Sequence, residues 1–271
     1  MRGISDRRGG WQVVTRTALL VAAGAISTGV AIAQLQPVCV PPPLGMVAWW
    51  PGDGNTLDIV GGDMGTWNGT SAYTAGEVGQ AFSFNGSSWV QAASTPSLSP
   101  TAAITIDAWI QPQATATNRI VDKITAGGGD GYLLDLLSNH LRLIVDGKAV
   151  SGTTTLSAGV TYHVAGTFDG STLNVYVNGV NDGSLSATTT IPTNSLPLRI
   201  GADQTGANRF SGWIDEVEIF DRALSQGEIQ AIFNAASAGK CKPQPIPATS
   251  SLGFAVLALL VIAAGLLFLG R

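Results

Sequence analysis

Three aspartates have the side-chain chemistry to hold a hard metal ion. Asp58 and Asp63 lie in a glycine-rich stretch after the first expected strand, and Asp215 lies in the last expected strand. Carboxylate and carbonyl oxygens are the ligands that calcium takes in proteins. If the two ends of the domain meet, these oxygens can converge, so the sequence predicts a structural calcium ion. The alternative is that Asp58 and Asp63 form turns and that Asp215 accepts from a backbone amide.

A run of acidic residues near the end of the domain raises the question of glycoside hydrolysis. Residues 215–221 read Asp-Glu-Val-Glu-Ile-Phe-Asp, and hydrolysis needs two carboxylates that flank the scissile bond. In a regular strand Glu216 and Glu218 share one face while Asp215 points to the other, so the run is interpreted as solvated surface. The two histidines, His140 and His163, have no Cys or His at metal-ligand spacing. We therefore predict that the protein is not an enzyme.

Two tryptophans are the best candidates for contact with a sugar. Sugars stack on exposed aromatic rings, and Trp67 and Trp89 lie near glycine-rich loops, where binding residues often occur. The alternative is that both rings belong to the core, as we expect for the tryptophans that lie within strands. The sequence thus predicts carbohydrate contacts at Trp67 and Trp89.

The elements that would position these side chains are mostly strands. Short runs of β-branched and aromatic residues recur between Gly, Asn, Asp and Pro. The expected strands are 46–50, 81–85, 89–92, 104–110, 119–123, 132–137, 141–145, 162–168, 173–177, 198–200 and 213–220. One short helix is expected after Ser225, which forms a capping box with Glu228. This pattern predicts an all-β fold, an antiparallel β-sandwich with one short C-terminal helix.

The two cysteines, Cys39 and Cys241, bracket this strand-rich region. Before them, residues 1–33 combine a basic start with an apolar stretch that ends Ala-Ile-Ala, as in a signal peptide that signal peptidase removes. An uncleaved anchor is the alternative. Disulfides persist in oxidising compartments, so we predict an exported domain, residues 39–241, closed by a Cys39–Cys241 bridge.

The end of the chain predicts attachment or sorting at a membrane. Residues 242–251 form a proline-rich linker, and residues 252–271 form a hydrophobic C-terminal helix just long enough to span a bilayer. Residues 246–250, Ile-Pro-Ala-Thr-Ser, resemble the Ile-Pro-Thr-Leu type of tail that exosortase-like enzymes handle, with Ala248 and Thr249 in place of Thr-Leu. A retained anchor and a cleaved sorting signal both place the domain outside the cytoplasm, at a cell surface.

Charge excludes one class of partner. Residues 39–241 contain 8 Lys and Arg against 17 Asp and Glu, a formal charge of −9. Such a surface repels phosphate backbones, so nucleic acid is not an expected partner.

Several motifs in order resemble the laminin-G-like jelly-roll family, relatives of concanavalin A-like lectins and glucanases. They are Val-Ala-Trp-Trp-Pro-Gly-Asp-Gly at 47–54, Asp-Ile-Val-Gly-Gly at 58–62, Gly-Gln-Ala-Phe-Ser-Phe-Asn-Gly at 79–86, the strand 104–109, Phe-Asp-Gly at 168–170, Asn-Gly at 178–179 and the segment 212–225. The resemblance implies two curved antiparallel sheets of about six or seven strands each. It also implies a metal at Asp58 and Asp215.

The resemblance further implies a non-catalytic module that recognises carbohydrate or a surface protein. A bacterial extracytoplasmic binding module is therefore the function that the sequence favours. A structural envelope or matrix protein is the alternative, and a glycoside hydrolase ranks last.

Overall fold

This computed structural model describes residues 39–113 and 117–243. The predicted signal peptide, the linker beyond residue 243 and the hydrophobic C-terminal segment with its sorting motif lie outside the described residues. Within the two described ranges, no helix combines the length and the apolar character needed to cross a membrane.

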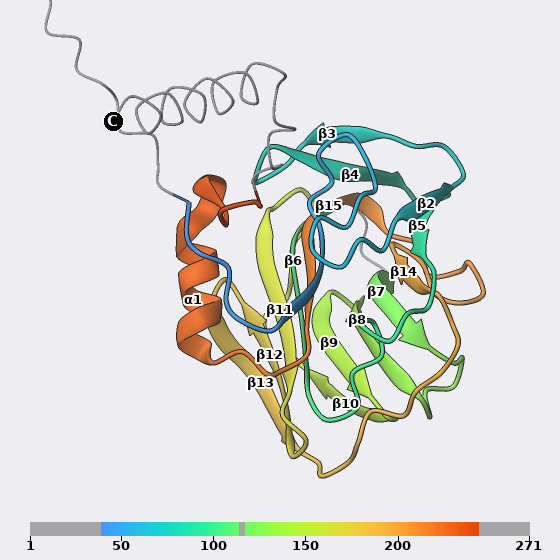
Figure 1. The fold of residues 1–271 in the computed structure, drawn as a ribbon, viewed down its shortest axis with the longest axis vertical. Coiled ribbons are helices and arrows are strands. Elements are labelled where there is room, and N and C mark those ends of the chain that lie inside the picture. The colour runs from blue at the N-terminus through green and yellow to red at the C-terminus, as the bar shows by residue number, and fades with distance from the viewer. Residues whose placement is uncertain (1–38, 114–116, 244–271) are drawn as a thin grey trace, which may run out of the picture. The chain divides into compact units, whose positions relative to one another are not determined.

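One of two antiparallel sheets has eight strands (Figure 1). Seven follow the order β13–β12–β11–β6–β15–β4–β3, and β1 also pairs with β15. Their bounds are β1 Met46–Trp50, β3 Tyr73–Ala75, β4 Gln80–Asn85, β6 Ile104–Pro112, β11 Tyr162–Phe168, β12 Thr172–Val177, β13 Val180–Ser186 and β15 Ser211–Phe220. Because β1 pairs with β15, the first and last strands of the domain lie side by side.

The other sheet has seven strands in the order β10–β9–β8–β7–β14–β5–β2. Their bounds are β2 Gly65–Asn68, β5 Trp89–Ala92, β7 Asn118–Ile124, β8 Gly131–Leu137, β9 His140–Val145, β10 Lys148–Ser151 and β14 Leu198–Ile200. The predicted all-β antiparallel sandwich is confirmed. The resemblance implies about six or seven strands in each sheet, so the seven-stranded sheet agrees and the other has one strand more.

The core lies between the inner faces of the two sheets. In β6 the alternate residues Ile104, Ile106, Ala108 and Ile110 all belong to it, as the period of two predicts. Facing strands of the seven-stranded sheet contribute Val121, Leu134, Leu143, Leu198 and Val90, among others. The side chains between these positions point to the outer face of each sheet, where polar groups gather.

The predicted helix is confirmed as α1, Gln226–Ala235, which is followed by a short 3-10 helix, Ala236–Ala238. The hydroxyl of Ser225 accepts from the backbone N–H of Glu228, and the Glu228 carboxylate accepts from the N–H of Ser225. The helix lies against the outer face of the eight-stranded sheet (Figure 1). There it forms a second small apolar cluster, made of Ala165, Tyr176, Phe220, Leu224, Ile229 and Ile232.

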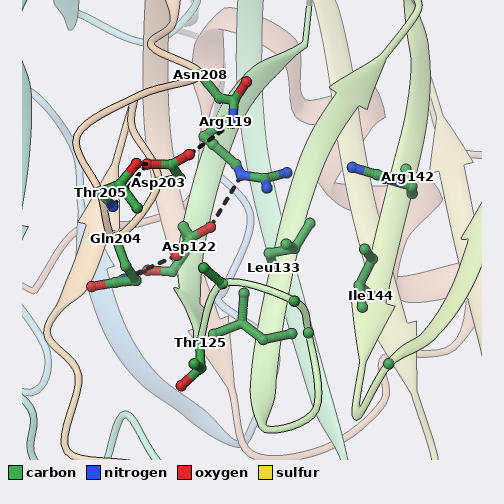
Figure 2. Close-up of a pocket in the computed structure, with 15 residues that line it drawn as sticks. Arg119, Asp122, Thr125, Leu133, Arg142, Ile144, Asp203, Gln204, Thr205 and Asn208 are labelled. Carbon is green, nitrogen blue, oxygen red and sulfur yellow. Dashed lines mark hydrogen bonds and ion pairs between the residues drawn. The ribbon is translucent and has the colours of Figure 1, made fainter.

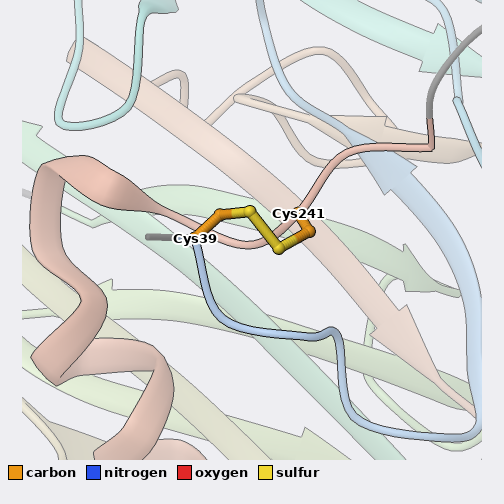
Figure 3. Close-up of a disulfide and its surroundings, with 2 residues drawn as sticks. All are labelled: Cys39 and Cys241. Atoms are coloured by element: carbon orange, nitrogen blue, oxygen red, sulfur yellow. A yellow bond between two sulfur atoms is a disulfide. The ribbon is translucent and has the colours of Figure 1, made fainter. Parts of the chain in front are cut away.

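The predicted disulfide is confirmed (Figure 3). Cys39 and Cys241 are bonded although they lie 202 residues apart in sequence, and their Cα atoms are 4.9 Å apart. Backbone hydrogen bonds support the bridge: Val40 N–H donates to the carbonyl of Gly239, and Cys241 N–H donates to the carbonyl of Val40. The two ends of the described domain are thus joined covalently and by backbone pairing.

Candidate functional site

A cavity of about 390 Å³ opens on the outer face of the seven-stranded sheet (Figure 2). Strands β7, β8 and β9 form its floor, and three segments surround it: residues 125–128, the turn at Gly147 and residues 203–208. We call it the sheet pocket. It combines an apolar floor with several charged and amide side chains, as small-ligand sites do.

Strand register places the floor of the sheet pocket. Arg119 of β7 pairs with Asp135 of β8, which pairs with Arg142 of β9. The next cross-strand pair whose side chains point to the outer face is Asp122 of β7 with Leu133 of β8. A β-bulge between Arg119 and Val121 allows both Arg119 and Asp122 to face outward although they are three residues apart.

Asp135 is the centre of a charged cluster in this floor. Its carboxylate is fully buried and accepts from Nε and Nη2 of Arg142, at 2.9 and 2.7 Å. Nη1 of Arg119 donates to the same carboxylate. Figure 2 shows the two guanidinium groups pointing toward each other across β8. One buried carboxylate therefore fixes two arginines in the pocket floor.

Asp122 extends the cluster toward the 203–208 loop. Its carboxylate lies 3.1 Å from Nε of Arg119 and accepts from Nε2 of Gln204 at 3.0 Å. Burial raises the pKa of Asp122 to about 6, against the opposing effects of the Gln204 hydrogen bond and the Arg119 charge. This carboxyl therefore titrates near neutral pH.

Asp203 holds the loop that forms one wall. Its side chain accepts from the backbone N–H groups of Thr205 and Ala207, the Thr205 hydroxyl and the amide of Asn208. Burial alone would raise the pKa of Asp203, but these hydrogen bonds outweigh it and hold the pKa below its usual value. The wall is thus fixed by an ionised carboxylate whose two oxygens already accept hydrogen bonds.

None of the five charged residues that form or support the sheet pocket was predicted from the sequence; they are Arg119, Asp122, Asp135, Arg142 and Asp203. A signal existed: ionic residues interrupt the otherwise apolar strands at 119–123, 132–137 and 141–145. On an outer sheet face such residues can equally be ordinary solvated side chains. Their grouping depends on register and on the bulge in β7.

The two predicted sugar-contacting tryptophans have different environments. Trp67 lies in β2 and packs against the rings of Tyr73, Phe82 and Phe84, at centroid distances of 5.4–5.8 Å. Its Nε1 donates to the Tyr73 hydroxyl at 2.9 Å. Trp67 is therefore half-buried and packs against the edge of the core, and its role as a ligand contact stays a prediction.

Trp89 lies on the outer face of the same sheet as the pocket. The guanidinium groups of Arg199 and Arg209 lie 5.3 and 5.4 Å from its ring centroid. Both separations fall within the range of cation–π contact. Its indole is half-buried, and its role as a ligand contact stays a prediction.

The three predicted metal ligands do not form one group, although Asp58 and Asp63 each place a carboxylate oxygen next to Gly61. Asp58 is buried and accepts from the backbone N–H groups of Trp49, Val60 and Gly61, so it folds the loop after β1. Asp63 accepts from the hydroxyls of Thr95 and Ser97, and Asp215 accepts from Val78 N–H.

In the part of the chain that the structure describes, no group of three or more His, Cys, Asp or Glu side chains could hold a metal ion. Asp58, Asp63 and Asp215 form no such group of side chains among these residues. Calcium binding itself stays a prediction.

The acidic run in the last strand is not solvated surface, which corrects the sequence interpretation. A bulge in β15 lies between Asp215 and Glu218, and Glu216 at the bulge has a φ of 52°. Because of this bulge, Asp215, Glu216 and Glu218 are all fully buried outside the core, on the outer face of the eight-stranded sheet. We call these three residues, with Asp107 on β6, the buried acid cluster.

Lysines and a histidine pair with the buried acid cluster. Nζ of Lys240 lies 2.7 Å from Glu218, and Nζ of Lys242 lies 2.9 Å from Glu216. His163 pairs with Asp107 at 2.9 Å. Lys240 is itself buried, so residues 240–242, next to the disulfide, close over these acids.

Burial raises the pKa of several acids in this cluster. The pKa of Asp215 rises to about 8, and those of Glu216 and Glu218 also rise because burial outweighs the nearby lysine charges. Two buried carboxylates of this kind resemble an acid–base pair in composition. Their side chains are fully buried, so they line no surface of the described domain.

Comparison with known proteins agrees with the fold. The family model Laminin_G_3, described as the concanavalin A-like lectin/glucanases superfamily, matches residues 84–230. The comparison with curated proteins found no match.

Solved structures share the architecture at low sequence identity. Domain 4 of AbnA, a GH43 extracellular arabinanase from Geobacillus stearothermophilus solved with arabinotriose, is 20% identical with a TM-score of 0.57, over 70% of this chain and 98% of that one. The binding domain of Paraclostridial Mosquitocidal Protein 1 is 17% identical with a TM-score of 0.58, over 70% of this chain and 52% of that one.

The binding domain of botulinum neurotoxin DC, solved with SialylT, is 14% identical with a TM-score of 0.55, over 70% and 51% of the two chains. This chain thus spans about half of each toxin binding domain. At these identities the likeness shows the fold. Since the family model matches more than half of its length, the chain belongs to the concanavalin A-like lectin/glucanases superfamily.

Proposed function

We propose that this protein is a non-catalytic saccharide-binding module that works outside the cytoplasm. The observation that carries the proposal is the sheet pocket, in which Arg119 and Arg142 are fixed by a buried carboxylate above an apolar floor. Directional polar groups fixed before binding lose little conformational freedom when a ligand arrives. Such a site suits a ligand rich in hydrogen-bonding groups.

The relatives in fold support a saccharide as that ligand. The arabinanase domain was solved with arabinotriose and one neurotoxin binding domain with SialylT. Another similar structure belongs to botulinum neurotoxin type C, whose cell entry depends on interaction with two ganglioside molecules. Protein recognition is the competing choice, because a further neurotoxin binding domain was solved with rat synaptotagmin II.

The disulfide supports a location outside the cytoplasm, because such bridges are rare where thiols are kept reduced. In this proposal the segment 252–271 would hold the domain at a bacterial surface or direct its sorting there. Limited proteolysis and fractionation of the native host cells would test this location. Recovery of the full chain in the cytoplasm with two free thiols would contradict it.

A glycan array with the purified protein tests the binding function. We expect binding to a restricted set of saccharides, and loss of that binding in Arg142→Gln. Arg222→Gln is the matched control, because Arg222 is an ion-paired arginine, with Glu228, far from the sheet pocket in the fold. No binding to any saccharide would contradict the proposal and favour a structural envelope role.

A further inference from the structure

We infer that the sheet pocket selects saccharides that carry an acidic group, and that this group binds the free edge of the Arg142 guanidinium. This inference rests on the proposed saccharide-binding function and narrows it to one chemical class. It follows from where the arginines lie, which of their hydrogens are free, and what the neighbouring aspartates already bind.

Arginine is concentrated on one side of an acidic domain. Residues 39–241 contain five arginines, against an overall formal charge of −9. Four of the five lie on or over the outer face of the seven-stranded sheet; they are Arg119, Arg142, Arg199 and Arg209. Composition alone would not gather them there. The planar guanidinium is the side chain best matched to carboxylate and sulfate groups.

The aspartates beside these arginines have no free accepting oxygen. Both oxygens of Asp135 accept from arginine, and those of Asp122 contact Gln204 and Arg119. Both oxygens of Asp203 accept from its own loop. The carboxylates therefore serve to orient other groups, and the charged groups that remain open to a ligand are donors.

Arg142 has a complete free edge. Its Nε and Nη2 both bind Asp135, which occupies one side of the guanidinium. Among the described residues its Nη1 has no hydrogen-bond or ion-pair partner. Nη1 keeps both of its hydrogens and Nη2 keeps one; one hydrogen from each lies at the end of the side chain, which points toward Arg119 (Figure 2). That pair has the spacing of a two-point contact with a second carboxylate.

A second donor lies on the far side of the same loop. The segment 203–208 borders the sheet pocket, and its Gly206 lies against the ring of Trp89. Arg209 is exposed and stacks over this ring, with no hydrogen-bond or ion-pair partner among the described residues. An acidic oligosaccharide could therefore contact Arg142 with one unit and Arg209 with another.

Calorimetric titration with matched saccharides tests the inference. The probes are a galacturonate oligosaccharide and its methyl ester, which share a backbone but differ in charge, with dextran sulfate and dextran as the sulfate pair. We expect the acid to bind at least about tenfold more tightly than its ester, because a charge-assisted contact is lost. Tighter binding of dextran sulfate than of the galacturonate would identify sulfate as the preferred acidic group.

Variants locate the contact. Arg142→Gln should weaken binding of the acid about tenfold, and Arg142→Lys should not restore it, since a lysine cannot make the two-point contact. Arg209→Gln, which breaks no hydrogen bond or ion pair within the described chain, should weaken binding about threefold without changing the thermal midpoint. Arg222→Gln should bind as the unaltered protein does.

Three results would overturn the inference. Equal binding of acid and ester, lost together in Arg142→Gln, would leave the proposed function intact and remove the acidic preference. Acid binding that is unchanged in Arg142→Gln and vanishes in about 0.3 M salt would show non-specific attraction. Failure of every saccharide to bind would reject the proposed function, and this inference with it.

Discussion

The outer faces of the two sheets use buried carboxylates in opposite ways. On the seven-stranded sheet, Asp135 fixes two arginines that line a cavity. On the eight-stranded sheet, Glu216 and Glu218 pair with lysines and are covered by residues 240–242. Arginine hydrogens on the first face stay unpaired, whereas the acids of the second face pair with lysines and hold the end of the domain. Burial of charge alone therefore does not mark a binding site.

The type of cation contributes to this difference. An arginine can satisfy a buried carboxylate with one edge and still offer another, whereas a lysine is a compact point charge. The covering chain contributes as well, since the disulfide fixes residues 240–242 over the acids. Loops surround the sheet pocket without closing it.

The largest expected effect comes from breaking an ion pair on the outer face of the eight-stranded sheet, which we call the closed face because residues 240–242 cover it. Lys240→Met leaves Glu218 buried without its cation, so we expect the free energy of unfolding to fall by about 3–5 kcal/mol. Urea denaturation measures it, with Lys148→Met at an exposed position of β10 as the control. Adding Glu218→Leu to Lys240→Met should recover much of the loss. A decrease of less than about 1 kcal/mol would show that Glu218 is neutral or hydrated.

Removal of the disulfide should be the next largest effect. Cys39→Ala with Cys241→Ala frees a loop of about 200 residues, and we expect a loss of about 2–4 kcal/mol in the free energy of unfolding. Because the bridge fixes residues 240–242 over the buried acid cluster, amide hydrogen exchange should accelerate near residues 215–218. Exchange in β8 and β9 should stay unchanged. Equal acceleration on both sheets would contradict the separate roles of the two faces.

The closed face should also make stability depend on pH. The pKa of Asp215 is raised to about 8 in the folded protein, so folding favours its neutral form. That contribution is complete at low pH and is lost as the pH rises through about 8, at no more than about 1.4 kcal/mol per pH unit. Glu216 and Glu218, whose pKa values are also raised, act in the same direction.

We therefore expect the protein to be less stable at pH 8 than at pH 5, with Asp215 contributing up to about 4 kcal/mol. Asp215→Asn should reduce this slope, because an amide keeps the acceptor for Val78 N–H without a charge. Denaturant unfolding at both pH values measures the effect. A slope that does not change in Asp215→Asn would assign the pH dependence to other groups.

The smallest expected effect concerns binding at the open face, the outer face of the seven-stranded sheet with its sheet pocket. The pKa of Asp122 is raised to about 6, so lowering the pH from 7 to 5 neutralises it beside Arg119 and Gln204. Its other charged neighbours are Asp203 in the loop and Arg199, its partner across to β14. Removal of one negative charge should tighten binding of the galacturonate oligosaccharide by about two- to threefold. Asp122→Asn should bind equally at both pH values, and a pH effect that persists in it would contradict this origin.

Strand prediction from the sequence succeeded in the interior of both sheets. All eleven expected strands are present. The four that were missed, β2, β3, β10 and β13, are the outermost strands of the two sheets. An edge strand is paired on one side and partly exposed on both faces, so its residues need not alternate. Val180–Ser186, for example, contains asparagine, aspartate, glycine and two serines but few apolar residues.

The sites were harder to predict because they depend on departures from regular strands. Regular strand alternation predicts that Asp215 and Glu216 lie on opposite faces of the sheet, but the bulge in β15 places both on the same face. The pocket likewise depends on a bulge in β7. Two other features did not depend on strand regularity and were predicted correctly from the sequence: the capping box at Ser225 and the pairing of the two cysteines.

The covalent joining of Cys39 to Cys241 has a mechanical consequence. When the chain is pulled at these two residues, the sulfur–sulfur bond carries the tension and the strands between them carry none. The sandwich would therefore stay folded under forces that unzip unbridged domains, and it would lengthen only after reduction. In the proposed role, a domain closed in this way would stay folded while the surface that bears it is under shear.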